Sequence, residues 1–482
     1  MHNSKSNVIK NIFILIAFVL YMISFLFWYS TVDFFEVSFT GYAELIFPWL
    51  LIAMAIQLIS FLFVKKVRYI DIGLWFVVLS YLFMYGNVFV EVFNMQTVLL
   101  WNPIASYTNE ELLESAVYVN CCVNMLSLGY LINYRPIELY NKSDVLQGNL
   151  ETDNEQKYYI GKVLIFIGFT CSLITSLNLI SVTQAYGSYT AYAQAGSAGL
   201  IDDFAFLFVP GIIYVLVSRK LDSFKGLLLT GFSILYFLVV MMLSGSRKTQ
   251  IFAILALVLC FLWVYRPKKL GVGKTIVLLI LGTVFLDMIY IIREYRTDLD
   301  EVIPAFFDSL TNFEVIGNLL GETLTETGIS FCAVASIIKC VPTVFPYEYG
   351  MTILRTIPSF LPIGWLFPDF FNKASSTIVI NQYLNLPVGD SLYGDFYWNW
   401  GGFFGAFAAL ILGVVFSNMF KKLKAGSTEV YFSVLYIVLI GVRAGIFELF
   451  RPLFMVVFIP WLLKLILRKR NKVTSYEKSS LN

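Results

Sequence analysis

Long apolar segments recur along the whole chain and are separated by shorter polar stretches. A helix needs about 20 apolar residues to cross a bilayer whose hydrocarbon core is about 30 Å thick. About twelve segments approach that length. They are residues 12–29, 45–64, 72–93, 116–132, 163–182, 201–218, 227–243, 251–265, 275–292, 402–420, 430–447 and 453–467. The pattern predicts an all-α fold, a polytopic bundle of about 12 membrane-spanning helices.

The segment 293–401 is the longest interval between two predicted spans. Loops of more than about 15 residues are uncommon and usually functional. This one is apolar and rich in proline, and its apolar run 327–341 is too short to span. We expect it to fold back on the bundle, partly as re-entrant or interfacial helices. The chain then divides into helices one to nine (1–292), a large loop with short helices (293–401), helices ten to twelve (402–467) and a tail (468–482).

The composition fits this interpretation. Hydrophobic residues make up 58% of the chain and charged residues only 14%, and the mean hydropathy is +0.75. A typical soluble domain carries about 25% charged residues. These values exclude a soluble enzyme, a disordered protein and a nucleic-acid-binding protein.

Basic residues indicate the orientation, because Lys and Arg near span ends stay on the cytoplasmic side. They cluster after the second predicted span at Lys65 and Lys66, and after the tenth at Lys421 and Lys422. An even number of spans places both termini on one side, so we expect both to be cytoplasmic and the loop 293–401 to be extracytoplasmic. The segment 12–29 lacks a small-residue cleavage site, so we interpret it as a retained first helix.

The histidine and cysteine residues do not form a recognisable catalytic or metal-binding pattern. His2 is the only histidine, and the six cysteines show no CxxC spacing. Histidine-based triads and a recognisable metal site are therefore excluded, and we expect no metal or cofactor. Catalysis must use carboxylates, Arg, Lys, Tyr or Ser.

Some cations depart from the cytoplasmic trend, and an intramembrane charge is a functional hypothesis by default. They are Arg247, Lys248, Arg293, Arg296, Lys339, Arg355, Lys373, Arg443 and Arg451. Guanidinium groups match phosphate oxygens in a two-point geometry, so a cluster of them suggests a diphosphate site. The alternative is that each pairs with a local acid, as Arg451 could with Glu448, or extends to lipid headgroups.

The pattern also places the candidate cations on predicted elements. Arg247 and Lys248 are expected to end the seventh helix, and Arg443 to lie inside the eleventh. A tight turn at 448–450 is expected before Arg451. We assign Arg247, Arg293 and Arg443 to catalysis by neutralising a leaving diphosphate. Substrate binding would be assisted by Lys248, Arg296, Arg355 and Arg451.

Carboxylates and aromatic rings of the long loop complete the candidate site. Glu322, Glu326 or Asp395 could deprotonate an acceptor hydroxyl, although they could equally be solvated acids. Aromatic faces beside an amide would suit sugar rings, but such rings also collect at membrane interfaces without a ligand. The candidates for sugar binding are Tyr393, Tyr397, Trp398 and Asn399.

Two motifs resemble those of the oligosaccharide repeat-unit polymerases of the Wzy type, which make O-antigen or capsule. One is the Ser-Gly-Ser-Arg sequence at 244–247, and the other is the acid-, Tyr-, Asn- and Gly-rich segment 389–405. The resemblance covers about residues 201–467. Only Arg247 is matched to a motif position, and the other arginines are assigned from chemistry and location.

The resemblance implies a multi-pass enzyme of the bacterial cytoplasmic membrane whose active side is extracytoplasmic. A metal-independent glycosyltransferase would transfer the growing glycan from undecaprenyl diphosphate to the next undecaprenyl-diphosphate-linked repeat unit. Its implied partners are these donor and acceptor lipids, membrane lipid, a chain-length regulator and a flippase, with no nucleic acid. Two alternatives stay open at this point, a lipid-linked oligosaccharide flippase and an O-antigen-type glycan ligase.

Overall fold

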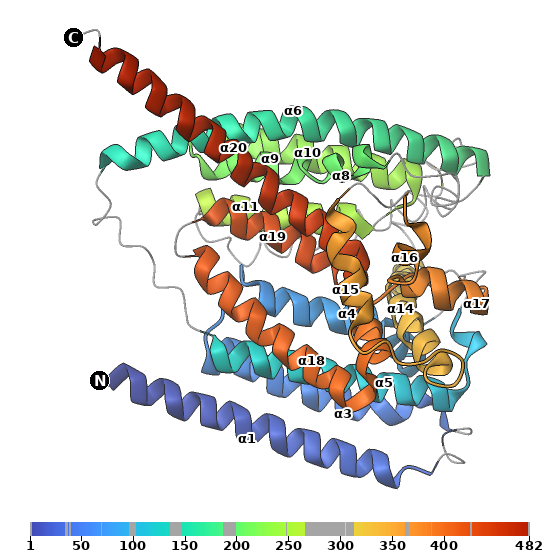
Figure 1. Ribbon diagram of the computed structural model, residues 1–482. Coiled ribbons are helices and arrows are strands. Elements are labelled where there is room, and N and C mark those ends of the chain that lie inside the picture. Colours follow the sequence, from blue (N-terminus) through green and yellow to red (C-terminus); the bar gives the residue numbers. More distant parts are fainter. Residues whose placement is uncertain are drawn as a thin grey trace. The chain divides into compact units, whose positions relative to one another are not determined.

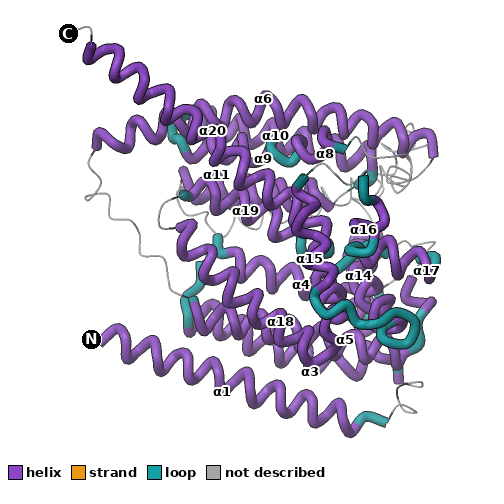
Figure 2. The backbone as a smooth tube through the Cα atoms, viewed as in Figure 1, coloured by secondary structure: helices purple, strands orange, loops and turns teal. Residues whose placement is uncertain are grey.

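The computed structural model describes residues 2–33, 37, 40–68, 70–95, 103–134, 147–186, 199–246, 248–265, 304, 313–361, 366–386, 388–424 and 427–480. Every regular element in these residues is a helix (Figure 2). This confirms the predicted all-α class. The chain forms two compact units, which are described separately.

Unit 1 comprises Met1–Glu138, Ser309–Ala425 and Gly441–Leu449. Its long helices are α1 (His2–Thr31), α3 (Tyr42–Leu58, continued by η1, Ile59–Val64), α4 (Ile72–Val92), α5 (Asn109–Asn133), α14 (Phe313–Cys340) and α18 (Leu392–Lys424). Its short helices are η2 (Pro103–Ser106), α15 (Met351–Thr356), η3 (Ile357–Phe360), α16 (Pro368–Asn372), η4 (Thr377–Asn381) and α17 (Gln382–Leu384). Helices α3, α4 and α5 pack together, and α18 runs along α5 (Figure 1).

Unit 2 comprises Leu139–Asp308, Gly426–Ile440 and Phe450–Asn482. Its helices are α6 (Gln147–Tyr186), α8 (Leu200–Ala205), α9 (Phe208–Val217), α10 (Ser223–Ser244), α11 (Lys248–Tyr265), α19 (Thr428–Ile440) and the larger part of α20 (Ile446–Ser480). Helix α6 packs along α8 and α9, and α11 packs against α10, α19 and α9. A buried apolar cluster on α6, α9 and α20 includes Leu164, Tyr214 and Met455.

Ten helices of the described residues are long and apolar enough to cross a membrane. They include the predicted fourth and twelfth spans, as α5 and the first part of α20. The predicted ninth span, 275–292, lies outside the described residues. The predicted sixth span is also among the ten, as Leu200–Val217, with a two-residue interruption at 206–207 between α8 and α9.

Two predicted helix ends were wrong. Helix α10 ends at Ser244, because Gly245 adopts the left-handed conformation (φ 72°) that commonly ends helices. Lys248 consequently begins α11 and does not end the preceding helix. The predicted eleventh span also ends early, since α19 stops at Ile440 and the chain turns over residues 441–445. Arg443 therefore lies in a turn rather than inside a helix.

The tight turn expected at 448–450 was wrong as well. Those residues and Arg451 belong to α20. The break falls earlier because Gly441 and Gly445 flank Arg443, and glycine readily leaves the helical conformation.

Glycines bring the helices of unit 1 into close contact. Gly86 of α4 lies against the carbonyl group of Leu324 in α14, and a Cβ on Gly328 would lie 2.6 Å from Asn87 Nδ2. Gly129 of α5 lies against the carbonyl group of Leu410 in α18. Small residues of this kind let helix backbones approach closely inside a membrane. The long loop is in this way packed into the bundle through α14.

Candidate functional site

Helix α18 consists of two halves that reverse direction at Gly401. Gly401 has φ 73° and ψ −169°, which is not helical. The Phe396 carbonyl oxygen lies 3.0 Å from a Cβ placed on Gly405, whereas these residues would be about 13 Å apart along a straight helix. The segment before Gly401 therefore folds back beside the segment after it. This reversal coincides with the boundary predicted between the loop and the tenth span.

The first half, 392–400, which we call the re-entrant helix, lies in the interior of unit 1. The hydroxyl groups of Tyr393 and Ser80 share a hydrogen bond of 2.7 Å, and Ser80 lies near the middle of α4. Tyr118 of α5 donates to the Tyr393 carbonyl at 3.0 Å. The chain thus reaches the depth of the middle of α4 and then returns through residues 392–400. The sequence predicted that the long loop folds back on the bundle, and its re-entrant position in a membrane stays a prediction.

The break at Gly401 leaves backbone carbonyl groups without partners in the helix, and the loop donates hydrogen bonds to them. The carbonyls of Trp398 and Asn399 accept hydrogen bonds from the backbone N–H groups of Glu348 and Tyr349, each at 3.0 Å. The Asn399 side chain donates to Thr352 Oγ1 at 2.7 Å and accepts from the backbone of 350 at 2.8 Å. The loop 348–352 is consequently fixed to the reversal.

The turn 441–445 meets the beginning of the re-entrant helix. Asp395 Oδ2 accepts a hydrogen bond of 2.6 Å from the backbone N–H of Ile446, the first residue of α20. The carboxylate of Asp390 lies against Gly445. Both aspartates are almost completely buried, with 2% exposure for Asp390 and 1% for Asp395. Two segments far apart in the sequence are therefore joined by buried carboxylates.

Arg443 projects from this turn onto α4. Its guanidinium carbon lies 5.8 Å from the centre of the Phe83 ring, a cation–π distance. Among the described residues no carboxylate forms an ion pair with Arg443. Ser80 and Phe83 are three residues apart on α4 and share a face. The same face of α4 therefore contacts the re-entrant helix and the candidate cation.

The other candidate cations have acidic partners or lie elsewhere. Arg355 donates to Glu348 Oε2 at 2.7 Å in unit 1. Arg451 pairs in unit 2 with Asp203 at 2.6 Å, rather than with Glu448 as the sequence suggested. Lys248 is half-buried in unit 2. Arg247, Arg293 and Arg296 lie outside the described residues.

The candidate bases Glu322 and Glu326 lie on α14, four residues apart and so on one face of the helix. Glu322 is buried, with 6% exposure, and Glu326 is half-buried. They precede Gly328, which packs against Asn87 one turn beyond Phe83 on α4. Both acids therefore belong to the same unit as Arg443, and their role stays a prediction.

The predicted sugar-binding residues are interior side chains. Tyr393, Tyr397, Trp398 and Asn399 are all buried. Tyr397 packs edge-on against Tyr118, with ring centres 5.0 Å apart. These residues hold the re-entrant helix in place here, and their contact with sugar stays a prediction.

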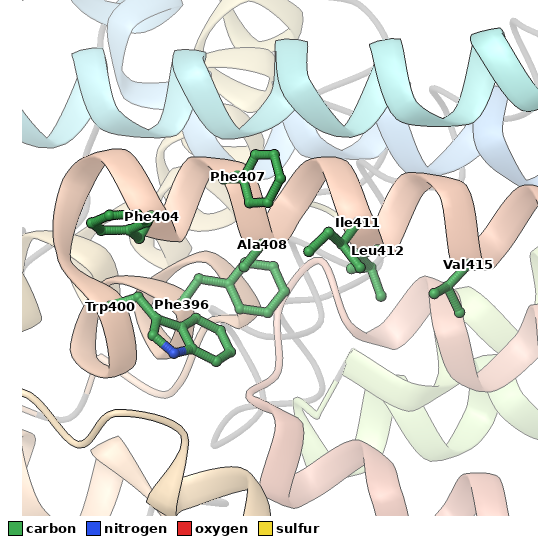
Figure 3. A pocket seen from close by; sticks show the side chains of 8 residues that line it. All are labelled: Phe396, Trp400, Phe404, Phe407, Ala408, Ile411, Leu412 and Val415. Carbon is green, nitrogen blue, oxygen red and sulfur yellow. The ribbon is translucent and has the colours of Figure 1, made fainter.

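An apolar groove of about 380 Å³ follows the outside of α18. Phe396 and Trp400 from the first half lie beside Phe404 and Phe407 from the second half (Figure 3). Ala408, Ile411, Leu412 and Val415 line the rest. This lining is almost entirely apolar and carries no charged side chain, so it suits hydrocarbon.

Sequence reasoning missed several contributors to the site. Phe83, Ser80 and Gly445 were not singled out, because their roles come from contacts between distant segments. The glycines that flank Arg443 were an available signal for a turn. No three His, Cys, Asp or Glu side chains of the described residues come together as a possible metal site.

Comparison with known protein families identifies the chain. The family model of the O-antigen polysaccharide polymerase Wzy matches residues 8–472, which is nearly the whole chain. The chain belongs to the Wzy family. As a Wzy protein it is a multi-pass membrane enzyme of the polymerising glycosyltransferase type that acts on oligosaccharide repeat units. The match favours a polymerase over the flippase and ligase alternatives. Searches of curated proteins and of solved structures give no match.

Proposed function

We propose that this Wzy protein joins undecaprenyl-diphosphate-linked repeat units at the outer face of the bacterial cytoplasmic membrane. The growing glycan leaves its lipid diphosphate and is transferred to the next lipid-linked unit. The resulting O-antigen or capsular chain grows by one repeat unit at each step. Both termini are cytoplasmic in this topology, as the distribution of basic residues indicates.

The observation that carries the proposal is Arg443, which packs half-buried against α4 of unit 1 and has no carboxylate partner among the described residues. A half-buried charge held among membrane-spanning helices is costly to retain without a use. In the proposed topology the turn 441–445 and the re-entrant helix both enter from the outer side. An anionic group arriving from that side would meet the guanidinium of Arg443.

The proposed reaction breaks the bond between the anomeric carbon of the donor and its diphosphate oxygen. The bond that forms joins the same carbon to an acceptor hydroxyl oxygen. Arg443 stabilises the negative charge that develops on the leaving diphosphate. The acceptor proton passes to a carboxylate, for which Glu322 and Glu326 on α14 are the candidates. No step in this scheme requires a metal ion or a cofactor.

The remaining assignments extend this scheme. Arg247 and Arg293 are proposed as further contacts to the diphosphate, and Arg296, Arg355, Arg451 and Lys248 as contacts to substrate. The buried residues Tyr393, Tyr397, Trp398 and Asn399 are proposed to shape the acceptor side. A flippase and a chain-length regulator are proposed as partners that supply units and limit the polymer.

Substitution of Arg443 tests the proposal. Arg443→Ala should lower the rate of polymerisation by about 100-fold or more, the usual loss when a charge-stabilising donor is removed. The rate of Arg443→Lys should lie between the rates of the natural protein and of Arg443→Ala, because an ammonium group keeps the charge but cannot make the two-point contact of a guanidinium group. The measurement is the initial rate with purified full-length protein in nanodiscs and lipid-linked units extracted from a strain that lacks the gene.

A matched control is Arg219→Ala, which removes an exposed arginine from the turn before α10. It should keep the normal rate and chain length. Normal chain lengths in a stably folded Arg443→Ala protein would remove Arg443 from the mechanism.

A further inference from the structure

The turn that carries Arg443 depends on unit 1 for its position. Residues Gly441–Leu449 belong to unit 1, whereas α19 before them and Phe450 onward belong to unit 2. With 13 residues, α19 is about 20 Å long, less than the roughly 30 Å of a bilayer core. The turn therefore follows a helix too short to span, and its contacts with the re-entrant segment fix it within unit 1.

Asp395 holds the end of the turn through the backbone. Its Oδ2 accepts the 2.6 Å hydrogen bond from Ile446, whose N–H has no partner within α20 because it begins the helix. An acidic side chain at this position also complements the positive end of the helix dipole. The other carboxylate oxygen of Asp395 has no hydrogen-bond partner among the described residues.

Asp390 contacts the turn at Gly445, the residue before Ile446. Its Oδ1 accepts hydrogen bonds from the Ser376 hydroxyl and, at 2.8 Å, from the backbone N–H of Ser391. Its Oδ2 lies so close to Gly445 that a Cβ there would collide with it. Asp390 is fixed by the loop and in turn leaves room only for glycine at 445.

Within the part of the chain that the structure describes, no ion pair joins either aspartate to the guanidinium of Arg443. Burying two carboxylates beside each other is expensive; here Asp395 accepts a hydrogen bond from the backbone of the turn, and Asp390 packs against Gly445. We propose that Asp390 and Asp395 are positioning residues that clamp the turn, so that Arg443 is placed over Phe83 while its guanidinium stays available for the donor diphosphate. This inference rests on the proposed function and assigns Asp395 a different role from general base.

The two roles of Asp395 predict different results for one conservative change. Asp395→Asn keeps an oxygen that can accept from Ile446 but cannot take a proton from an acceptor hydroxyl. A positioning role predicts that Asp395→Ala lowers the initial rate by a factor of about 5 to 150, the usual effect of leaving a buried donor without its partner. It also predicts that Asp395→Asn keeps most of the natural initial rate. A general-base role predicts that both variants are equally inactive.

A double-mutant cycle separates positioning of Arg443 from general loss of structure. In the Arg443→Lys background, adding Asp395→Ala should lower the rate by a much smaller factor than it does in the natural protein. If Asp395→Ala lowers the rate by the same factor in both backgrounds, Asp395 acts independently of Arg443 and the inference is overturned. Asp369→Ala is the matched control, because this loop aspartate on α16 is exposed and should keep the normal rate.

The outcomes also separate this inference from the proposed function. A low rate for Arg443→Ala together with a normal rate for Asp395→Ala would contradict the positioning role of Asp395 but not the proposed function. A normal rate for Arg443→Ala would overturn the role of the arginine itself. If Asp395→Ala does not fold, Asp395→Asn still decides, because a folded but inactive Asp395→Asn protein contradicts the clamp.

Discussion

Arg443 differs from the other described candidate cations in what surrounds it. Arg355 and Arg451 each pair with an acid, at 2.7 Å and 2.6 Å, and those pairs lower their capacity to bind another anion. Arg443 contacts the face of Phe83 instead, which restrains the guanidinium without neutralising it. The residue that best suits an anionic substrate is therefore one that sequence alone had singled out.

Gly445→Ala should disable the site without removing any functional group. The added Cβ collides with the Asp390 carboxylate, so either the turn or that carboxylate must move. We expect a large loss of polymerisation and a destabilisation of about 1–3 kcal/mol, as for overpacked interiors. Gly231→Ala on α10 is the control, because nothing lies within 4 Å of its Cβ position. Equal activity and equal thermal stability of the two variants would contradict the close contact.

Sequence reasoning identified Arg443 and Asp395 but not the relation between them. Arg443 could be selected because an intramembrane charge is visible in a hydropathy pattern, and Asp395 because it is a carboxylate of the long loop. The hydrogen bond from Ile446 to Asp395 joins residues that no local pattern connects. Phe83 could not be found either, since one more phenylalanine in an apolar helix carries no distinguishing signal.

At the scale of elements, the site is built from interrupted helices. Helix α18 reverses at Gly401, and the chain turns between α19 and α20. Such breaks free backbone groups, which are tolerated at membrane depth only when protein or water satisfies them. Here Glu348, Tyr349 and Asp395 do so. The sequence placed the boundary between the long loop and the tenth span at residue 401 without predicting that the chain reverses there. It misplaced the turn after α19, because continuous apolar residues mask a break that tertiary contacts stabilise.

Gly86→Ala tests how the long loop is packed into the bundle. A Cβ on Gly86 would collide with the Leu324 carbonyl oxygen, and a backbone atom cannot move aside as a side chain can. The crossing of α4 and α14 must then widen, at a cost of about 1–3 kcal/mol. The melting temperature in detergent should fall relative to Gly231→Ala. An unchanged melting temperature would mean that α14 does not cross α4 at this glycine.

For the whole molecule, the hydropathy pattern predicted the fold class and the positions of most of the membrane-spanning helices. The ten apolar helices of the described residues confirm a polytopic bundle. The family match over residues 8–472 confirms the resemblance first suggested by residues 244–247 and 389–405. Hydropathy could not show that the chain forms two units or that the loop enters one of them, because both depend on contacts between distant segments. Sidedness stays a prediction from the basic residues.

The most direct test of the central claim is to resolve lipid-linked glycans by size and by leaflet in a strain that lacks the gene. The account predicts single repeat units on the outer leaflet and no ladder of longer chains. Restoring the natural gene should restore the ladder, whereas restoring the Arg443→Ala variant should not. Units trapped on the cytoplasmic leaflet would contradict the account, because they would show that the protein moves lipid-linked units across the membrane rather than joining them.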